Sequence, residues 1–205
     1  MRCSQLARCV AVATLLATLS PAGAARAQQA QEATDLLLAL IRLRSPGIEN
    51  VGTKSQIIEA VAAQNGFKLS DAEIQKRDGE WQASIEVTPF KKQLQTNEAG
   101  RILRGFVERG NKTYTEGLLM DKRGALVAAY PAPSDYYQGD EDKFRSPFQS
   151  GELYIGPIHF DHSTQAYVSD VCTPIFEEGS SAIGVLCMAV RLSKGPGIAP
   201  DKRHE

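Results

Sequence analysis

The spacing of hydrophobic and polar positions changes near residue 113, from a helical period to the two-residue period of strands. Before that point, apolar residues recur three or four positions apart, as on one face of an amphipathic helix. Ser70 and Glu73 have the spacing of a capping box, so a short polar helix is expected after Ser70, interrupted at Asp78-Gly79. The predicted helices cover about residues 33–43, 53–66, 72–76 and 88–109.

Two strand-like runs follow, residues 114–120 and 125–130. They are joined by Asp121-Lys122-Arg123-Gly124, a four-residue connection ending in glycine, which indicates a hairpin. Leu153–Phe160 is expected to be a strand broken at Gly156-Pro157.

The last two runs, residues 167–176 and 183–192, are the clearest strands. If Gly179-Ser180 is a two-residue turn between them, Cys172 lies opposite Cys187. Helices followed by about five antiparallel strands in a meander predict an α+β domain, with the N-terminal helices packed on the sheet.

The first 27 residues have the order of a secretory signal peptide. Arg2 and Arg8 form a basic start, Cys9–Leu19 is apolar or small, and Ala25-Arg26-Ala27 is an A-x-A cleavage site. The apolar run is shorter than the roughly 20 residues that cross a bilayer. We therefore expect cleavage after Ala27 and an exported, periplasmic or secreted, soluble protein.

Length and charge narrow the class of protein further. The remaining 178 residues (205 − 27) suit one domain. The net charge of the whole chain is −1, and removal of the three arginines of residues 1–27 gives −4. This balance, without a basic stripe, argues against nucleic-acid binding.

Cys172 and Cys187 are the cysteines left after this cleavage. In an oxidising compartment they are a candidate disulfide, and two buried thiols are the alternative. Both alternatives stay open from the sequence.

The stretch Ser134–Asp142 carries acids and two adjacent tyrosines in a polar loop of about twenty residues. A loop of this length calls for a function or for disorder, and aromatic residues are scarce in disordered linkers. Carboxylates beside tyrosine rings favour binding of an ammonium group, through ion pairing and cation–π attraction. The indole of Trp81 could add a ring and an N–H donor.

Catalytic interpretations of the acids and histidines are weaker. Asp140-Glu141 would point to opposite sides of an extended chain, unlike the facing carboxyls of glycosidases. Asp161-His162-Ser163 contains triad residue types, but a triad is defined by geometry and no nucleophile elbow is present. A divalent metal on His159, Asp161 and His162 is the remaining enzymatic alternative, as in a metal-dependent hydrolase.

Four segments together resemble the Cache/PDC extracellular sensor domains. Gly117–Ala128 resembles the strand–"D-x-x-G-x-x-V-A"–strand hairpin of that family, and Pro133–Phe144 resembles its "T-S-D-Y-x-Q-G-D-E-x-K-W" loop. Phe160-Asp161-His162-Ser163 resembles "F-D-E-S", and Pro174–Leu186 resembles the closing "P-V…I-G-V-L" strands.

The resemblance implies a PAS-like sheet with a ligand pocket under the loop after the second strand, which recognises amino acids, amines or carboxylates. Ala132-Pro133, Phe144 and His162 depart from the family pattern. Family members sit between membrane helices ahead of a signalling module, which this sequence does not contain.

The sequence thus predicts a stand-alone exported sensor module that binds a small polar metabolite, without catalysis, cofactor or metal. Residues 1–27 are the signal peptide, 28–112 the helical region, 113–193 the sheet and 194–205 a flexible tail. A membrane-bound receptor or kinase is the expected partner, and a structural envelope protein with a vestigial pocket is a further alternative. The expected ligand contacts are Asp135, Tyr136, Tyr137, Asp140, Asp161, Trp81 and Asp170.

Overall fold

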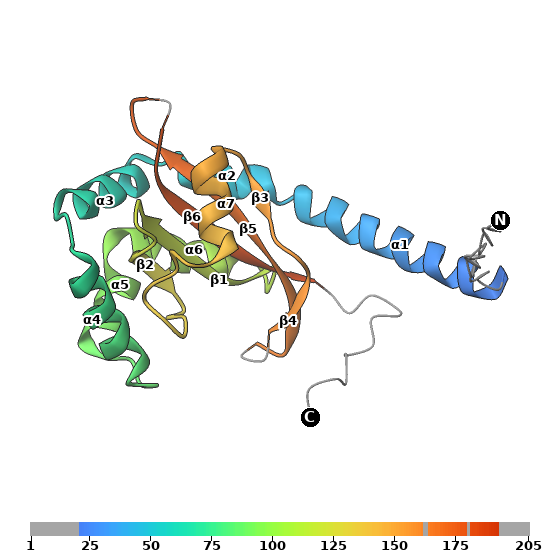
Figure 1. Cartoon of the computed structure of the whole chain (residues 1–205), viewed down its shortest axis with the longest axis horizontal. Helices are drawn as coiled ribbons and strands as arrows, with labels where there is room; N and C mark the ends of the chain where they lie inside the picture. The colour runs from blue at the N-terminus through green and yellow to red at the C-terminus, as the bar shows by residue number, and fades with distance from the viewer. Residues whose placement is uncertain (1–20, 162–163, 180, 193–205) are drawn as a thin grey trace, which may run out of the picture.

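The computed structural model describes residues 21–161, 164–179 and 181–192, and the predicted cleavage site lies within its first helix. The architecture is the predicted α+β class: helices pack on a six-stranded antiparallel sheet (Figure 1). The helices are α1 (Pro21–Arg42), α2 (Ser45–Gly52), α3 (Ser55–Gly66), α4 (Asp71–Gln82), α5 (Pro89–Thr96), α6 (Glu98–Arg109) and α7 (Asp142–Ser150). The strands are β1 (Tyr114–Asp121), β2 (Leu126–Tyr130), β3 (Tyr154–Ile155), β4 (His159–Asp161), β5 (Ala166–Phe176) and β6 (Ala182–Leu192).

The sheet has the order β2-β1-β6-β5-β3, with β4 paired to another part of β5. The predicted meander is therefore wrong: β6 returns to the centre of the sheet and pairs with both β1 and β5. The β5–β6 register is the predicted one, and Cys172 and Cys187 face each other and form a disulfide. Of the two alternatives for these cysteines, the structure has the bonded one.

The helices before the sheet differ from the prediction at three places. Helix α2 occupies a stretch where Pro46-Gly47 suggests a break, because Pro46 lies in its first turn, where the missing N–H is not needed. The capping box of Ser70 and Glu73 is present, but α4 continues through Gly79 to Gln82. The predicted helix of residues 88–109 is two helices, because Asn97 ends α5 and caps α6 by accepting from the Gly100 amide.

Apolar side chains cover both faces of the sheet. On one face, α2, α3 and α6 contribute Ile48, Ile57 and Leu103 to a core with Leu119 and Leu186 of the central strands. The other face is covered by Trp81, Tyr136 and Phe144, which pack with the disulfide and with Leu118. Figure 1 shows α7 lying across this second face and α4 and α5 at the β2 edge.

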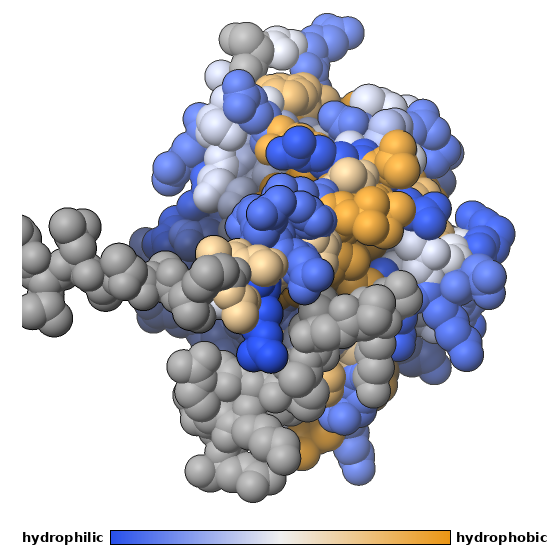
Figure 2. Space-filling view, turned by 90° about the vertical axis from the view of Figure 1, so that its right-hand side faces the viewer, coloured by the Kyte–Doolittle hydropathy of each residue, from blue (hydrophilic) through white to orange (hydrophobic). Residues whose placement is uncertain are grey.

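Helix α1 extends away from the sheet (Figure 1), and its last turns are anchored by Leu37 and Ile41. Figure 2 looks from the side toward which α1 projects and shows apolar patches within a mainly polar surface. None of the helices within the described ranges is long and apolar enough to cross a membrane.

Candidate functional site

Two of the segments that carry the sequence resemblance, the hairpin at Gly117–Ala128 and the loop at Pro133–Phe144, meet in space. Gly124, in the β1–β2 turn, has φ +81°, and a Cβ there would lie 2.3 Å from the Cα of Gly139. The Gln138 amide donates to the Gly124 carbonyl at 2.8 Å, and the Leu126 amide donates to the Tyr136 carbonyl at 3.2 Å. The loop after β2 therefore folds back on its own hairpin, and only glycine fits at this contact.

Helix α4 fixes the other side of the loop. The Asp78 carboxylate accepts hydrogen bonds from the amides of Tyr136 and Tyr137 at 2.8 and 2.9 Å. The Trp81 indole donates to the Pro133 carbonyl at 2.9 Å. Since charged acceptors make the stronger backbone hydrogen bonds, Asp78 is the main positioning residue of the loop.

Beyond this loop, the second face of the sheet carries a polar cavity of about 560 Å³. Its floor contains one row across three strands: Glu116 of β1, Ala189 of β6 and Asp170 of β5 are register partners. Neighbouring strands lie about 4.8 Å apart, so the backbones of the two acidic residues are about 10 Å apart. The small Ala189 side chain leaves space between their carboxylates.

The walls of the cavity come from three other segments. The stretch Pro131–Asp135 forms one wall, and Glu141 with Lys143, at the start of α7, forms another. The third wall is the β4 side, where His159, Asp161 and Thr164 face the cavity. The volume is within the range of about 300–1,000 Å³ that holds small ligands.

Glu116 has the most perturbed acidity in this cavity. Burial raises the pKa of its carboxyl to about 7, and Asp170, Asp161 and Glu141 add to the rise against the opposing effect of Lys143. Glu116 and Asp170 accept no side-chain hydrogen bond from another described residue. Two floor carboxylates are therefore left to a ligand or to water.

Lys143 is the ammonium group of this cavity. It pairs with Glu141 at 3.1 Å. Burial lowers the pKa of Lys143, but Glu141, Asp170 and Glu116 together outweigh this effect and raise it. Lys143 thus stays protonated and offsets part of the surrounding negative charge.

The predicted site residues divide into two groups. Asp135, Asp161 and Asp170 line the cavity together. The Asp135 carboxylate also accepts from Ser134 and Gln138, and Asp161 accepts from Thr164 at 2.5 Å.

The other four predicted residues do not line the cavity. Tyr136 and Trp81 are buried in the second core, with their ring centroids 5.9 Å apart, because both are needed to fill the space under α4. Tyr137 borders a small hollow beside α4, and Asp140 is exposed on the surface. Trp81 therefore supports the wall of the cavity through Pro133 instead of contacting its contents.

Sequence reasoning missed Glu116, Lys143 and the loop anchor Asp78. Glu116 was detectable, because it occupies the same face of β1 as the buried Leu118 two residues later. Lys143 belongs to α7, which the sequence did not predict. Asp78 precedes a glycine and so has the pattern of a helix break, and no local signal distinguishes that role from a loop anchor.

The structure places only some of the residues of the alternative interpretation, a metal-dependent hydrolase, at the cavity. His159 and Asp161 both border the cavity, as expected if they share a strand face, whereas His162 lies outside the described residues. Within the part of the chain that the structure describes, no group of three or more His, Cys, Asp or Glu side chains is arranged to hold a metal ion.

Comparison with known proteins gives structural likenesses only. No family model matches the chain, and no curated protein does. The ligand-binding domain of the Campylobacter jejuni chemoreceptor Tlp3, in complex with 4-methylisoleucine, has a TM-score of 0.38 and 15% identity over 73% of this chain and 60% of that chain. An extracellular ligand binding receptor from Desulfohalobium retbaense DSM5692 has a TM-score of 0.38 and 13% identity, over 66% of this chain and 24% of the receptor.

A third similar structure is the ligand binding domain of Mlp24 with asparagine, with a TM-score of 0.34, 15% identity and coverage of 78% of this chain and 57% of that domain. The chain spans less than two thirds of each of these proteins. All three are described as ligand-binding domains or receptors. TM-scores of 0.34 to 0.38 carry no argument about function, which has to come from the cavity itself.

Proposed function

We propose that the protein is an exported binding and sensing module whose ligand is a small molecule with an ammonium group, an amine or an amino acid. The observation that carries this proposal is the floor row of the cavity. Glu116 and Asp170 flank Ala189 on adjacent strands and have no side-chain hydrogen bond to another described residue.

The charges around the cavity favour a cation over an anion. Glu116, Asp135, Glu141, Asp161 and Asp170 provide five carboxyl groups, against the ammonium of Lys143 and the ring of His159. Burial makes ionisation of Glu116 costly in the empty cavity, and a ligand ammonium would remove that cost by ion pairing. A ligand carrying only a carboxylate would meet repulsion from the floor.

Lys143 would make the cavity prefer amino acids over amines. Its ammonium group, already paired with Glu141, could also receive the α-carboxylate of an amino acid whose ammonium lies at the floor. Amino acids would then bind more tightly than amines of the same size. Neither class requires a catalytic residue.

The sensing role rests on the sequence. Residues 1–27 predict export, and the resemblance to Cache-type sensors predicts that ligand occupancy is read by a membrane-bound receptor or kinase. The receptor or kinase partner is likewise proposed from the sequence. It would bind a surface that the protein presents when its ligand is bound.

A thermal-shift screen of amines, amino acids and simple carboxylates tests the proposal. A ligand at 100 times its dissociation constant stabilises the folded state by about 2.7 kcal/mol. We expect stabilisation by compounds with an ammonium group and none by acetate or succinate. Stabilisation by carboxylates alone would contradict the proposed ligand class.

A further inference from the structure

A second cavity, of about 610 Å³, lies between α3, α4 and α5, at the β2 edge of the sheet. It shares no lining residue with the first cavity. We propose that it is an independent binding site for a small molecule that combines an apolar ring with a single carboxylate.

Arg77 of α4 supplies the charge that this ligand would meet. Its guanidinium lies 5.7 Å from the centroid of the Phe90 ring, which holds it at the cavity wall. Among the described residues it has no carboxylate partner within 4.0 Å, and it donates no hydrogen bond to a carboxylate or carbonyl oxygen of theirs. A guanidinium has five N–H donors in a planar fork that matches a carboxylate, so the N–H groups that do not face the Tyr136 hydroxyl are available to a ligand.

The Tyr136 hydroxyl is a second polar group beside Arg77. Tyr136 is fully buried, and its hydroxyl has no hydrogen-bond partner among the described residues. Burial raises the pKa of this phenol, whereas hydrogen bonding with the Arg77 and Gln64 side chains lowers it, so both lie close to the hydroxyl even though neither meets the geometry of a full hydrogen bond. Arg77 and Gln64 line the cavity, whereas Tyr136 lies behind them and does not. A buried hydroxyl without a full hydrogen bond is costly, and a small reorientation of Arg77 as it binds a ligand would relieve that cost.

The two acids near Arg77 already have partners. The Glu73 carboxylate accepts hydrogen bonds from the amide and hydroxyl of Ser70 at 2.8 and 2.7 Å. The Glu80 carboxylate forms an ion pair with Lys76, with Oε1 3.8 Å from Nζ. Their charge still reduces the positive potential around Arg77. The site is therefore suited to one carboxylate and disfavours a multiply charged group such as a phosphate.

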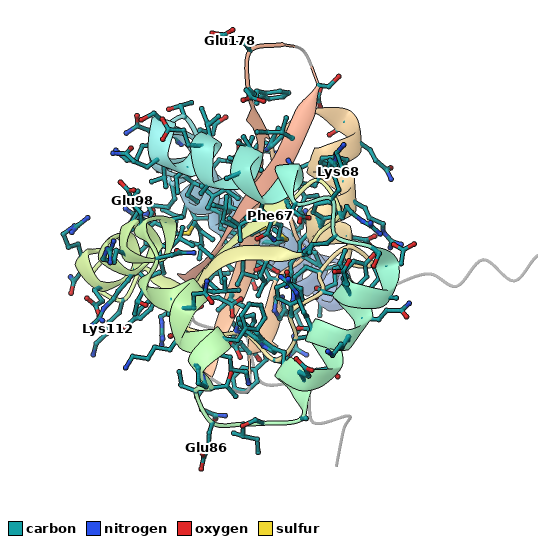
Figure 3. The ribbon with its side chains drawn as sticks, turned by 90° about the vertical axis from the view of Figure 1, so that its left-hand side faces the viewer. Phe67, Lys68, Glu86, Glu98, Lys112 and Glu178 are labelled. Carbon is teal, nitrogen blue, oxygen red and sulfur yellow. A yellow bond between two sulfur atoms is a disulfide. The ribbon has the colours of Figure 1, made fainter. Side chains whose placement is uncertain are left out.

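The remaining wall is suited to a ring. Phe67, Leu69, Phe90 and Leu94 line the cavity, and the Phe67 side chain is 74% exposed. Figure 3 looks onto this face and shows Phe67 near its centre, with Glu86 of the α4–α5 connection at the lower end. A bound ring would cover apolar surface that is otherwise in water, which is the driving force for its burial.

Isothermal titration of the purified full chain with phenylacetate, and with its neutral analogue phenylacetamide, tests this site. We expect phenylacetate to bind and Arg77→Gln to raise its dissociation constant at least tenfold, while phenylacetamide binds more weakly to the wild type. Arg101→Gln, on the exposed side of α6, is the matched control and should leave the dissociation constant unchanged. Absence of phenylacetate binding to the wild type would overturn the proposal.

A nuclear magnetic resonance titration of the wild type locates the ligand without any variant. Phenylacetate should shift the amide resonances of Phe67, Phe90 and Leu94, and not those of Glu116 or Asp170. Shifts confined to the first cavity would overturn the second site. Asp170→Asn changes the first cavity and should leave phenylacetate binding intact. The two proposals, this site and the ammonium site, can therefore be tested separately.

Discussion

Replacing Glu116 by glutamine should make the stability of the protein less dependent on pH. In the folded state, burial and neighbouring acids raise the pKa of this carboxyl from 4.5 to about 7. The folded protein thus holds the proton more tightly than the unfolded chain does. The resulting stabilisation is complete below pH 4.5 and is lost as the pH rises through about 7.

The size of the effect follows from the pKa difference. At 1.36 kcal/mol per pKa unit, the rise from 4.5 to about 7 corresponds to about 3 kcal/mol. Partial contact of the cavity with solvent makes this an upper value. Glutamine keeps the size of the side chain and remains neutral, so it should avoid the loss at high pH.

Urea unfolding followed by circular dichroism, between pH 5 and pH 8, measures this directly. The free energy of unfolding of Glu116→Gln, relative to the wild type, should rise across this range by up to about 3 kcal/mol and level off above pH 7.5. Glu86→Gln changes an exposed loop acid and should give a difference that does not vary with pH. Parallel curves for the wild type and Glu116→Gln would refute the burial of this carboxyl.

Other substitutions test the contacts that position the loop and strands around the cavity. Asp78→Ala leaves two loop amides without their acceptor, so the free energy of unfolding should fall by about 1–3 kcal/mol in urea and amine binding should weaken with it. Loss of the Cys172–Cys187 disulfide, by a double substitution to alanine, should cost about 3 kcal/mol in the same assay, since it closes a loop with a separation of 15 residues. Gly124→Ala should lower the thermal denaturation temperature, because the new Cβ would collide with Gly139. Gly79→Ala, where the Cβ would enter open space within α4, should leave that temperature unchanged or raise it. A lower denaturation temperature for Gly79→Ala than for Gly124→Ala would contradict the close approach of Gly124 and Gly139.

The strands were predictable from the sequence because their signals are local. The hairpin before Leu126 ends in a glycine. The turn expected at Gly179-Ser180, where Ser180 lies outside the described residues, predicts the β5–β6 register in which Cys172 faces Cys187. The order of the strands was not predictable in this way. Placement of β6 between β1 and β5 depends on packing between segments that are far apart in the chain.

Only some of the residues expected from the sequence border the candidate cavity. Asp135, Asp161 and Asp170 line the cavity, but the most conspicuous aromatic, Tyr136, is in the core. A tyrosine beside acids has the same local pattern whether its ring faces a ligand or Trp81, and the difference is set by α4. Lys143 could not be found because the start of α7 gave no recognised helix signal.

The most direct test of the ammonium site is isothermal titration of the amine or amino acid that stabilises the protein most, with two aspartate variants. Asp170→Asn neutralises a carboxylate of the cavity floor, whereas Asp140→Asn neutralises an exposed carboxylate outside it. We expect a dissociation constant at least tenfold higher for Asp170→Asn and an unchanged constant for Asp140→Asn. Unchanged binding by Asp170→Asn, or a loss of binding with Asp140→Asn alone, would contradict it.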